Sequence, residues 1–173
     1  LVGGQAGLIA LIQSDGSYKL HASYGLPAQV LPLVRPLFAD IPDSGQSVDP
    51  LRWTVPDLER RLNMVVRQIG IPLRQIVALP MTAGDDLIGV IYVLRREGAA
   101  FTSTDRRTLS AFAAQAAIAV HNARLYQAVK REKQRMDAII ENSGDGVMLL
   151  GPDEKITVFN RALTKMTGIP PEE

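Results

Sequence analysis

The amino-acid sequence predicts an α+β fold built from antiparallel hairpins and helices. Two pairs of short apolar runs, each pair joined by a turn signal, predict two β-hairpins. Residues 104–142 contain neither glycine nor proline, which predicts one long helix. A third, shorter hairpin follows this helix.

The first hairpin comprises residues 7–12 and 18–24, which flank the turn signal Asp15-Gly16. Side chains two residues apart in a strand point to the same face. The alternation therefore predicts one shared face for Tyr18, Leu20, Ala22 and Tyr24. It places His21 on the opposite face, toward water.

Prolines interrupt the next stretch, so residues 30–38 predict only a short, broken helix. A polar loop containing the only tryptophan, Trp53, follows it. Apolar residues on one helical face then predict a second helix that ends at Gly70: Leu58, Leu62, Val65, Val66 and Ile69. The β-branched runs 76–81 and 87–94 predict the second hairpin.

The helix at 104–142 would be about 60 Å long at ~1.5 Å per residue, so it must leave the domain that contains the hairpins. Its first half carries an a/d seam with 3-4-3-4-3 spacing, formed by Leu109, Phe112, Ala116, Ala119, Ala123 and Tyr126. The alanines would allow a second helix to approach closely. Val129 follows Tyr126 by three residues where four are expected, which predicts a phase slip in the repeat.

Beyond Gly144, the runs GVMLL and KITVFN flank a Gly-Pro-Asp-Glu turn and predict the third hairpin, with a short helix after it. These few elements cannot enclose a core of their own. We therefore expect the sequence to be part of a longer chain.

The composition excludes several kinds of site. The chain has no cysteine, which removes thiol nucleophiles, disulfides, Cys-ligated zinc, iron–sulfur clusters and thioether-linked chromophores. Its 19 Lys+Arg and 18 Asp+Glu give a net charge of +1, so no overall field would attract nucleic acid or an anionic membrane. No apolar run approaches the roughly 20 residues that cross a bilayer. We expect a cytoplasmic location without membrane contact.

Residues 70–126 resemble the C-terminal half of a GAF domain. The matching features are a strand ending in Leu79-Pro80, the Ile88-Gly89-Val90 strand, Phe101 with Asp105, Gln115, and the closing Asn122-Ala123-Arg124-Leu125-Tyr126. Together with a weaker N-terminal half, the resemblance implies a GAF-like sensory domain at 1–126 whose N-terminal helix is missing. It also implies a central antiparallel β-sheet flanked by helices.

Residues 141–173 are similar to the first third of a PAS domain, through Asp145-Gly146, the strand pair, Asn160-Arg161-Ala162 and Thr167-Gly168. The implied order is the GAF-like domain, a signalling-helix linker at 127–142 and a truncated PAS domain at 143–173. This order resembles the sensory half of bacterial signalling proteins, most often sensor histidine kinases and less often diguanylate cyclases. The resemblance implies a coiled-coil helix in a parallel homodimer.

The subfamily of GAF domains that binds cyclic nucleotides carries an Asn-Lys pair ahead of a Phe, and then Asp-Glu after a gap of three residues. Phe101 and Asp105 fit this pattern, but Arg106 replaces the Glu, and Arg95-Arg96 stands where Asn-Lys is expected. We therefore interpret Phe101 as packing the strand-to-helix corner, with Asp105 in the first turn of the helix.

The chain also lacks the residues that usually hold other cofactors. A covalently bound bilin needs a cysteine, and the chain has none. Haem or a metal ion would most simply use histidine, and we interpret His21 and His121 as structural or solvated. A phosphoacceptor role for His121 would need an acidic residue next and a proline five places on, where Asn122 and Tyr126 stand. The identity of any cofactor stays unknown.

In GAF domains small ligands lie between the sheet and the segment that corresponds to residues 31–57. Its apolar side chains include the candidate pocket residues Phe38, Ile41, Leu51 and Trp53. Such residues either plug the core or line a pocket for an unidentified small molecule, and the sequence leaves both open.

The sequence offers no catalytic motif, so we do not expect this chain to be an enzyme. We expect the chain to be the sensory input and dimerisation module of a bacterial signal-transduction protein. That protein is expected to be a sensor histidine kinase of a two-component system. A spacer that dimerises without sensing, and the input module of a diguanylate cyclase, are the alternatives.

Overall fold

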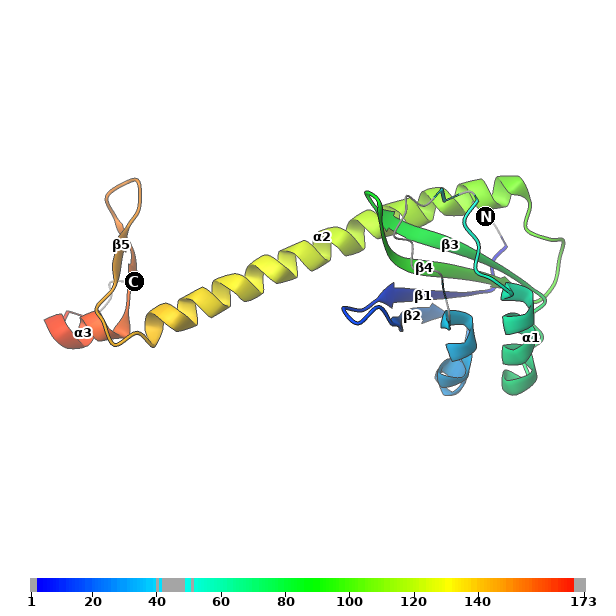
Figure 1. Ribbon diagram of the computed structural model, residues 1–173, viewed down its shortest axis with the longest axis horizontal. Coiled ribbons are helices and arrows are strands. Elements are labelled where there is room, and N and C mark those ends of the chain that lie inside the picture. Colours follow the sequence, from blue (N-terminus) through cyan, green and yellow to red (C-terminus); the bar gives the residue numbers. More distant parts are fainter. Residues whose placement is uncertain (1–2, 40, 42–48, 51, 170–173) are drawn as a thin grey trace. The chain divides into compact units, whose positions relative to one another are not determined.

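The computed structural model describes residues 3–39, 41, 49, 50 and 52–169 (Figure 1). Contacts along the chain divide it into two units, Leu1–His121 and Asn122–Glu173. We describe each unit by itself.

The three predicted hairpins and the long helix are confirmed. The first unit contains β1 (Ala6–Ile12), β2 (Tyr18–Tyr24), the 3-10 helix η1 (Ala28–Phe38), α1 (Leu58–Ile69), β3 (Gln75–Ala83), β4 (Asp86–Arg95) and the start of α2 (Ser103–Glu141). The second unit contains the rest of α2, β5 (Met148–Leu150), β6 (Ile156–Phe159) and α3 (Arg161–Thr167).

In the first unit the four described strands form an antiparallel sheet in the order β2-β1-β4-β3 (Figure 1). Strand β4 pairs on both sides, which explains why its sequence is apolar on both faces. Position 89 of this strand requires a glycine, because a Cβ there would lie 2.5 Å from the carbonyl oxygen of Ala10.

Helices cover both faces of the sheet. On one face, η1 and α1 enclose the main core, whose largest buried side chains include Leu8, Leu37, Val65, Tyr92 and Leu94. Two prolines inside η1, Pro32 and Pro36, remove backbone donors that a regular α-helix needs. On the other face, the fully buried Ala113 and Ala117 bring α2 close to the sheet.

The predicted shared face of β2 is wrong, because a β-bulge interrupts the strand. The register pairs Ile9 with Ala22 but Ala10 with Leu20, which leaves His21 as the extra residue. Residues opposite each other in a ladder share a face. Tyr18 and Leu20 therefore pack toward the main core, whereas Ala22 and Tyr24 lie on the face that α2 covers. His21 is exposed, as predicted.

In the second unit β5 and β6 form a two-stranded antiparallel hairpin, followed by α3. The side chain of Asn160 caps α3 by accepting a hydrogen bond from the backbone N–H of Leu163, at 3.1 Å. Asn160 is fully buried, although the side chains of β5 are exposed. Local hydrogen bonding, more than a core, therefore organises this unit.

Candidate functional site

The predicted pocket residues that the structure describes gather on one core. Ile41 is 8% exposed and belongs to the main core, and Phe38 and Trp53 are half-buried against it. The ring of Phe38 packs against that of Tyr92, with 5.6 Å between centroids and a tilt of 59°. Leu51 lies outside the described residues. The structure thus brings Phe38, Ile41 and Trp53 to the face of the sheet that η1 and α1 cover.

Two polar side chains hold the end of η1 against this face. The hydroxyl of Tyr92, deep in the core, donates to the carbonyl oxygen of Leu37 at 2.7 Å. Burial raises the pKa of Tyr92 well above its ordinary value, so the phenol stays protonated. The guanidinium of Arg61 donates to the carbonyl oxygens of Pro36, at 3.5 Å, and Ala39. These bonds fix the position of Phe38 and Ala39.

Arg61 and Tyr92 were not singled out from the sequence. A signal for Arg61 did exist, because it lies three residues after Leu58 and four before Val65, on the predicted apolar face of α1. Tyr92 stands within a strand that is apolar on both faces, and nothing in that pattern identifies the hydroxyl's partner.

A cavity of about 860 Å³ lies beside the end of η1 and the turn of the first hairpin. Phe38 and Ile41 supply apolar lining, and Lys19 and Arg35 supply cationic side chains. The carboxylate of Asp15 also lines it, and hydrogen bonds from Ser17 hold the pKa of that carboxyl below its usual value. Such a mixed lining suits a small molecule with an apolar part and a charged or polar part.

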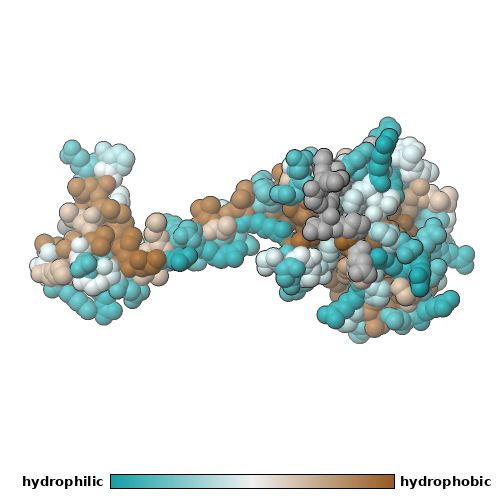
Figure 2. All heavy atoms as spheres, in the orientation of Figure 1, coloured by the Kyte–Doolittle hydropathy of each residue, from teal (hydrophilic) through white to brown (hydrophobic). Residues whose placement is uncertain are grey.

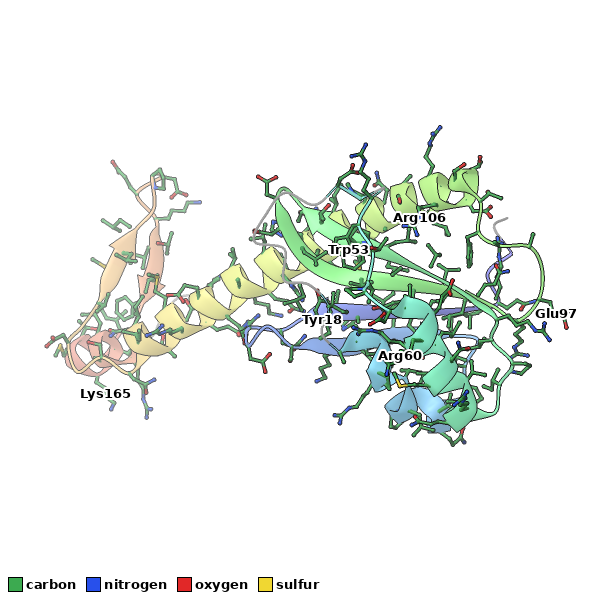
Figure 3. All side chains as sticks on the ribbon, turned by 45° about the vertical axis from the view of Figure 1, so that its right-hand side comes forward. Tyr18, Trp53, Arg60, Glu97, Arg106 and Lys165 are labelled. Atoms are coloured by element: carbon green, nitrogen blue, oxygen red, sulfur yellow. The ribbon has the colours of Figure 1, made fainter. Side chains whose placement is uncertain are left out.

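Trp53 lies next to the start of α2, where its carbonyl oxygen accepts a hydrogen bond from Arg106 at 3.4 Å (Figure 3). Its indole N–H is buried and has no acceptor within the part of the chain that the structure describes. A buried donor without a partner is costly and can serve a ligand's acceptor.

The corner between β4 and α2 is closed by its own residues. The guanidinium of Arg95 lies over the ring of Phe101, 4.0 Å from the centroid, and pairs with Asp105 at 3.2 Å. Thr102 and Asp105 exchange hydrogen bonds of 3.0 and 3.1 Å in a capping box. The backbone N–H of Thr102, and then Arg95, hold the pKa of Asp105 below its usual value. This geometry matches the interpretation of Phe101 as a packing residue.

The six predicted seam residues of α2 do not share one environment. Leu109 and Ala116 are half-buried against the sheet of their own unit. The other four are exposed: Phe112, Ala119, Ala123 and Tyr126. A surface for a second helix therefore cannot use Leu109 or Ala116 while α2 stays on the sheet.

Within the described residues, no helix is long and apolar enough to cross a membrane. Those residues also contain no cluster of three or more His, Cys, Asp or Glu side chains that could hold a metal ion.

Comparison with known proteins decides the family. A family profile described as GAF domain matches residues 1–121, well over half of the chain. The chain belongs to the GAF domain family. A second profile, described as PAS fold, matches residues 134–173, so a PAS-fold segment follows the GAF domain.

A curated protein also matches part of the chain. The chain is 34% identical over 80 residues to the formate hydrogenlyase transcriptional activator FhlA of Escherichia coli (strain K12). That alignment spans 46% of this chain and only 12% of the relative. The GAF and PAS matches support a signalling input role, and such domains are typically non-catalytic.

The first of two solved structures shows the same fold. The crystal structure of a domain assigned to a two-component sensor histidine kinase protein from Sinorhizobium meliloti 1021 superposes with a TM-score of 0.53 at 16% identity. The superposition covers 73% of this chain and 85% of the Sinorhizobium meliloti domain. The GAF domain/HD domain protein from Geobacter sulfurreducens reaches a TM-score of 0.45 at 19% identity, over 70% of this chain and 83% of that one.

Proposed function

We propose that this chain is the cytoplasmic sensory input and dimerisation module of a sensor histidine kinase in a bacterial two-component system. In this proposal a small molecule or partner acts on the GAF domain, and the change passes along α2 in a parallel homodimer. The PAS-fold segment receives it.

One observation carries the proposal. The helix α2 is continuous over 39 residues, from Ser103 to Glu141. Its first turns pack on the GAF sheet through Leu109 and Ala113, and its last turn bonds to Asn160 through the carbonyl of Ile140. In this proposal the continuous helix carries a change in the packing of its first turns to the PAS-fold segment.

The cavity beside Phe38 and Ile41 is the proposed ligand site. Its mixed lining holds two cationic side chains, Lys19 and Arg35, against the one carboxylate of Asp15, which favours a small organic anion over a cation. Because Tyr92 and Arg61 tie the end of η1 to the sheet and α1, a ligand that moves Phe38 would strain these bonds.

Thermal unfolding of the chain with a panel of small molecules tests sensing. A ligand at about 100 times its Kd stabilises the folded state by about 2.7 kcal/mol, which raises the Tm by on the order of 10 °C. The panel would hold aromatic acids, 2-oxoacids, cyclic nucleotides, purines and haem. If none of these compounds changes the Tm, the result favours the alternative, in which the chain is a spacer that dimerises without sensing. Input to a diguanylate cyclase stays the alternative for the parent protein.

Sedimentation velocity tests the dimer over a range of concentrations up to high micromolar. We expect a dimer at the upper end. A chain that stays monomeric throughout would contradict a relay through paired helices.

A further inference from the structure

A second cavity lies at the edge of the sheet, apart from the cavity beside Phe38 and Ile41. Its volume is about 430 Å³, which suits a small molecule. Its walls come from α1, from the start of β3, and from the loop that leads from β4 into α2 (Figure 1). The two cavities share no lining residue, so this one is a separate candidate site.

The apolar wall of this cavity is held in place by the core. Leu62 of α1 and Val77 of β3 line the cavity, and both are buried in the packed interior of the first unit. Phe101 also lines it, and the guanidinium of Arg95 holds that ring from 4.0 Å. An apolar group that enters the cavity therefore meets a preformed surface. Figure 2 shows apolar and polar side chains side by side on the first unit.

Three charged side chains line the same cavity. Glu59 lies in the first turn of α1, Arg74 lies directly before β3, and Arg106 lies near the start of α2. Within the described ranges no salt bridge joins Glu59 to either arginine. The two guanidinium groups and the carboxylate therefore keep their charges available to an occupant, since charged groups form the strongest hydrogen bonds.

Two hydrogen bonds hold the polar wall. Nη1 of Arg106 donates to the carbonyl oxygen of Trp53 at 3.4 Å, and the two side chains lie near each other in Figure 3. Nε2 of Gln75 donates to the carbonyl oxygen of Gly98 at 3.2 Å, which ties the loop before α2 to β3. Arg106 is half-buried, so water screens its charge less than that of an exposed arginine.

We propose that this cavity binds a free α-amino acid with an apolar side chain. The carboxylate of the amino acid pairs with Arg74 and Arg106, whose planar guanidinium groups match a carboxylate. Its ammonium group pairs with Glu59, and its side chain packs on Leu62 and Phe101.

The balance of charge selects this class of ligand. A dicarboxylate would place a second negative group beside Glu59, and a simple amine would leave both guanidinium groups without an anion. A molecule that carries one charge of each sign, with an apolar part, satisfies all three walls.

The inference goes beyond the proposed function, because it needs neither a dimer nor the cavity beside Phe38. Glu59 belongs to α1 and Arg106 to α2, which cover opposite faces of the sheet. An amino acid held by both residues ties these helices together across the edge of the sheet.

Isothermal titration calorimetry with the whole chain tests the ligand class. The probes are leucine, valine and phenylalanine, together with two analogues of leucine. Isocaproate lacks the ammonium group, and leucinamide lacks the carboxylate. We expect leucine to bind at least about tenfold more tightly than either analogue, because each analogue loses a charge-assisted contact. Equal affinity for leucine and an analogue overturns the proposal, as does the absence of binding by all three amino acids at millimolar concentration.

Substitutions then test the site. E59Q and R106Q should each weaken leucine binding at least about tenfold. R107Q is the matched control, because Arg107 is exposed on α2 next to Arg106 and does not line the cavity, and it should bind leucine unchanged. E59Q should leave the affinity for isocaproate unchanged, since that probe has no ammonium group. A merely structural role of Glu59 would weaken both probes and would overturn its assignment to the ammonium group.

The variant R35Q separates this inference from the proposed function, because Arg35 lines only the cavity beside Phe38. If R35Q weakens leucine binding and R106Q does not, leucine occupies that other cavity, which overturns this inference and supports the proposed ligand site. If R106Q weakens it and R35Q does not, the inference is confirmed. Circular dichroism checks that each variant stays folded, and E59Q tests the site independently because the side chain of Glu59 is exposed.

Discussion

Asn160 joins the last turn of α2 to the hairpin and helix that follow. Its Oδ1 accepts hydrogen bonds from the backbone N–H groups of Val147, at 2.8 Å, and Leu163, at 3.1 Å. Its Nδ2 donates to the carbonyl oxygens of Ile140 and Asp145, both at 2.9 Å. Each polar atom of the amide therefore has two partners, and the residue is 0% exposed.

The substitution Asn160→Asp keeps the two hydrogen bonds that this side chain accepts and removes the two that it donates. A carboxylate still accepts from the N–H groups of Val147 and Leu163, so the cap of α3 survives. The two donated bonds are lost, and a negative oxygen then faces the carbonyls of Ile140 and Asp145. At about 1 kcal/mol for each lost bond, with repulsion added, the local opening free energy should fall by about 2–4 kcal/mol.

Hydrogen exchange followed by mass spectrometry measures this change. A fall of about 3 kcal/mol corresponds to exchange roughly 100 times faster in peptides that span the junction between Ile140 and Val147, with α3 affected less. Asn142→Asp is the matched control, because the exposed side chain of Asn142 donates to the carbonyl oxygen of Ala138 in α2, at 2.7 Å, rather than to the segment that follows. Equal exchange rates in Asn160→Asp and the unchanged chain would refute the reasoning.

Three further substitutions test the first unit. Gly89→Ala forces a Cβ to within 2.5 Å of the Ala10 carbonyl oxygen and should lower the free energy of unfolding in urea by about 1–3 kcal/mol; an unchanged value would contradict the close packing. Tyr92→Phe removes the bond to Leu37 and should cost about 1–2 kcal/mol at neutral pH. Burial in the folded state raises the pKa of Tyr92, so the unchanged chain loses stability as pH rises above the ordinary value of 10.0. Tyr92→Phe should lose less stability over the same pH range. Equal losses, measured by urea unfolding, would count against a buried phenol. Hydrogen bonding from the backbone N–H of Thr102, and then from Arg95, lowers the pKa of Asp105, so its contribution to stability is present above the ordinary value of 3.8 and is lost as pH falls below it. Asp105→Asn should flatten that acid limb of the stability curve, and parallel limbs would contradict the lowered pKa of Asp105.

Local signals predicted the elements of this fold, because each depends on few neighbours along the chain. Asp15-Gly16 favours a hairpin wherever it stands, and a run without glycine or proline favours a helix. The bulge at His21 depends on how β1 and β2 pair, which alternation within one strand does not contain. A single extra residue therefore moved Ala22 and Tyr24 to the opposite face.

The candidate site was predicted only in part for a similar reason. Apolar side chains such as Phe38 and Trp53 signal burial, and the structure places them on the core. The bonds that position the end of η1 come from Arg61 and Tyr92, and their partners are backbone carbonyls. Backbone carbonyls carry no sequence signature, so these contacts emerge only from the fold.

The environment of the predicted seam of α2 was harder to predict, because a helix that packs on a sheet and a helix that pairs with another helix both use heptad-like spacing. Leu109 and Ala116, seven residues apart, fit either role until the sheet is seen to take them. Phe112, Ala119, Ala123 and Tyr126 are exposed, so the sheet takes only part of the predicted seam. If two copies pair through α2 as proposed, the pairing surface must come from residues that the sheet leaves exposed, because Leu109 and Ala116 are already packed on the sheet.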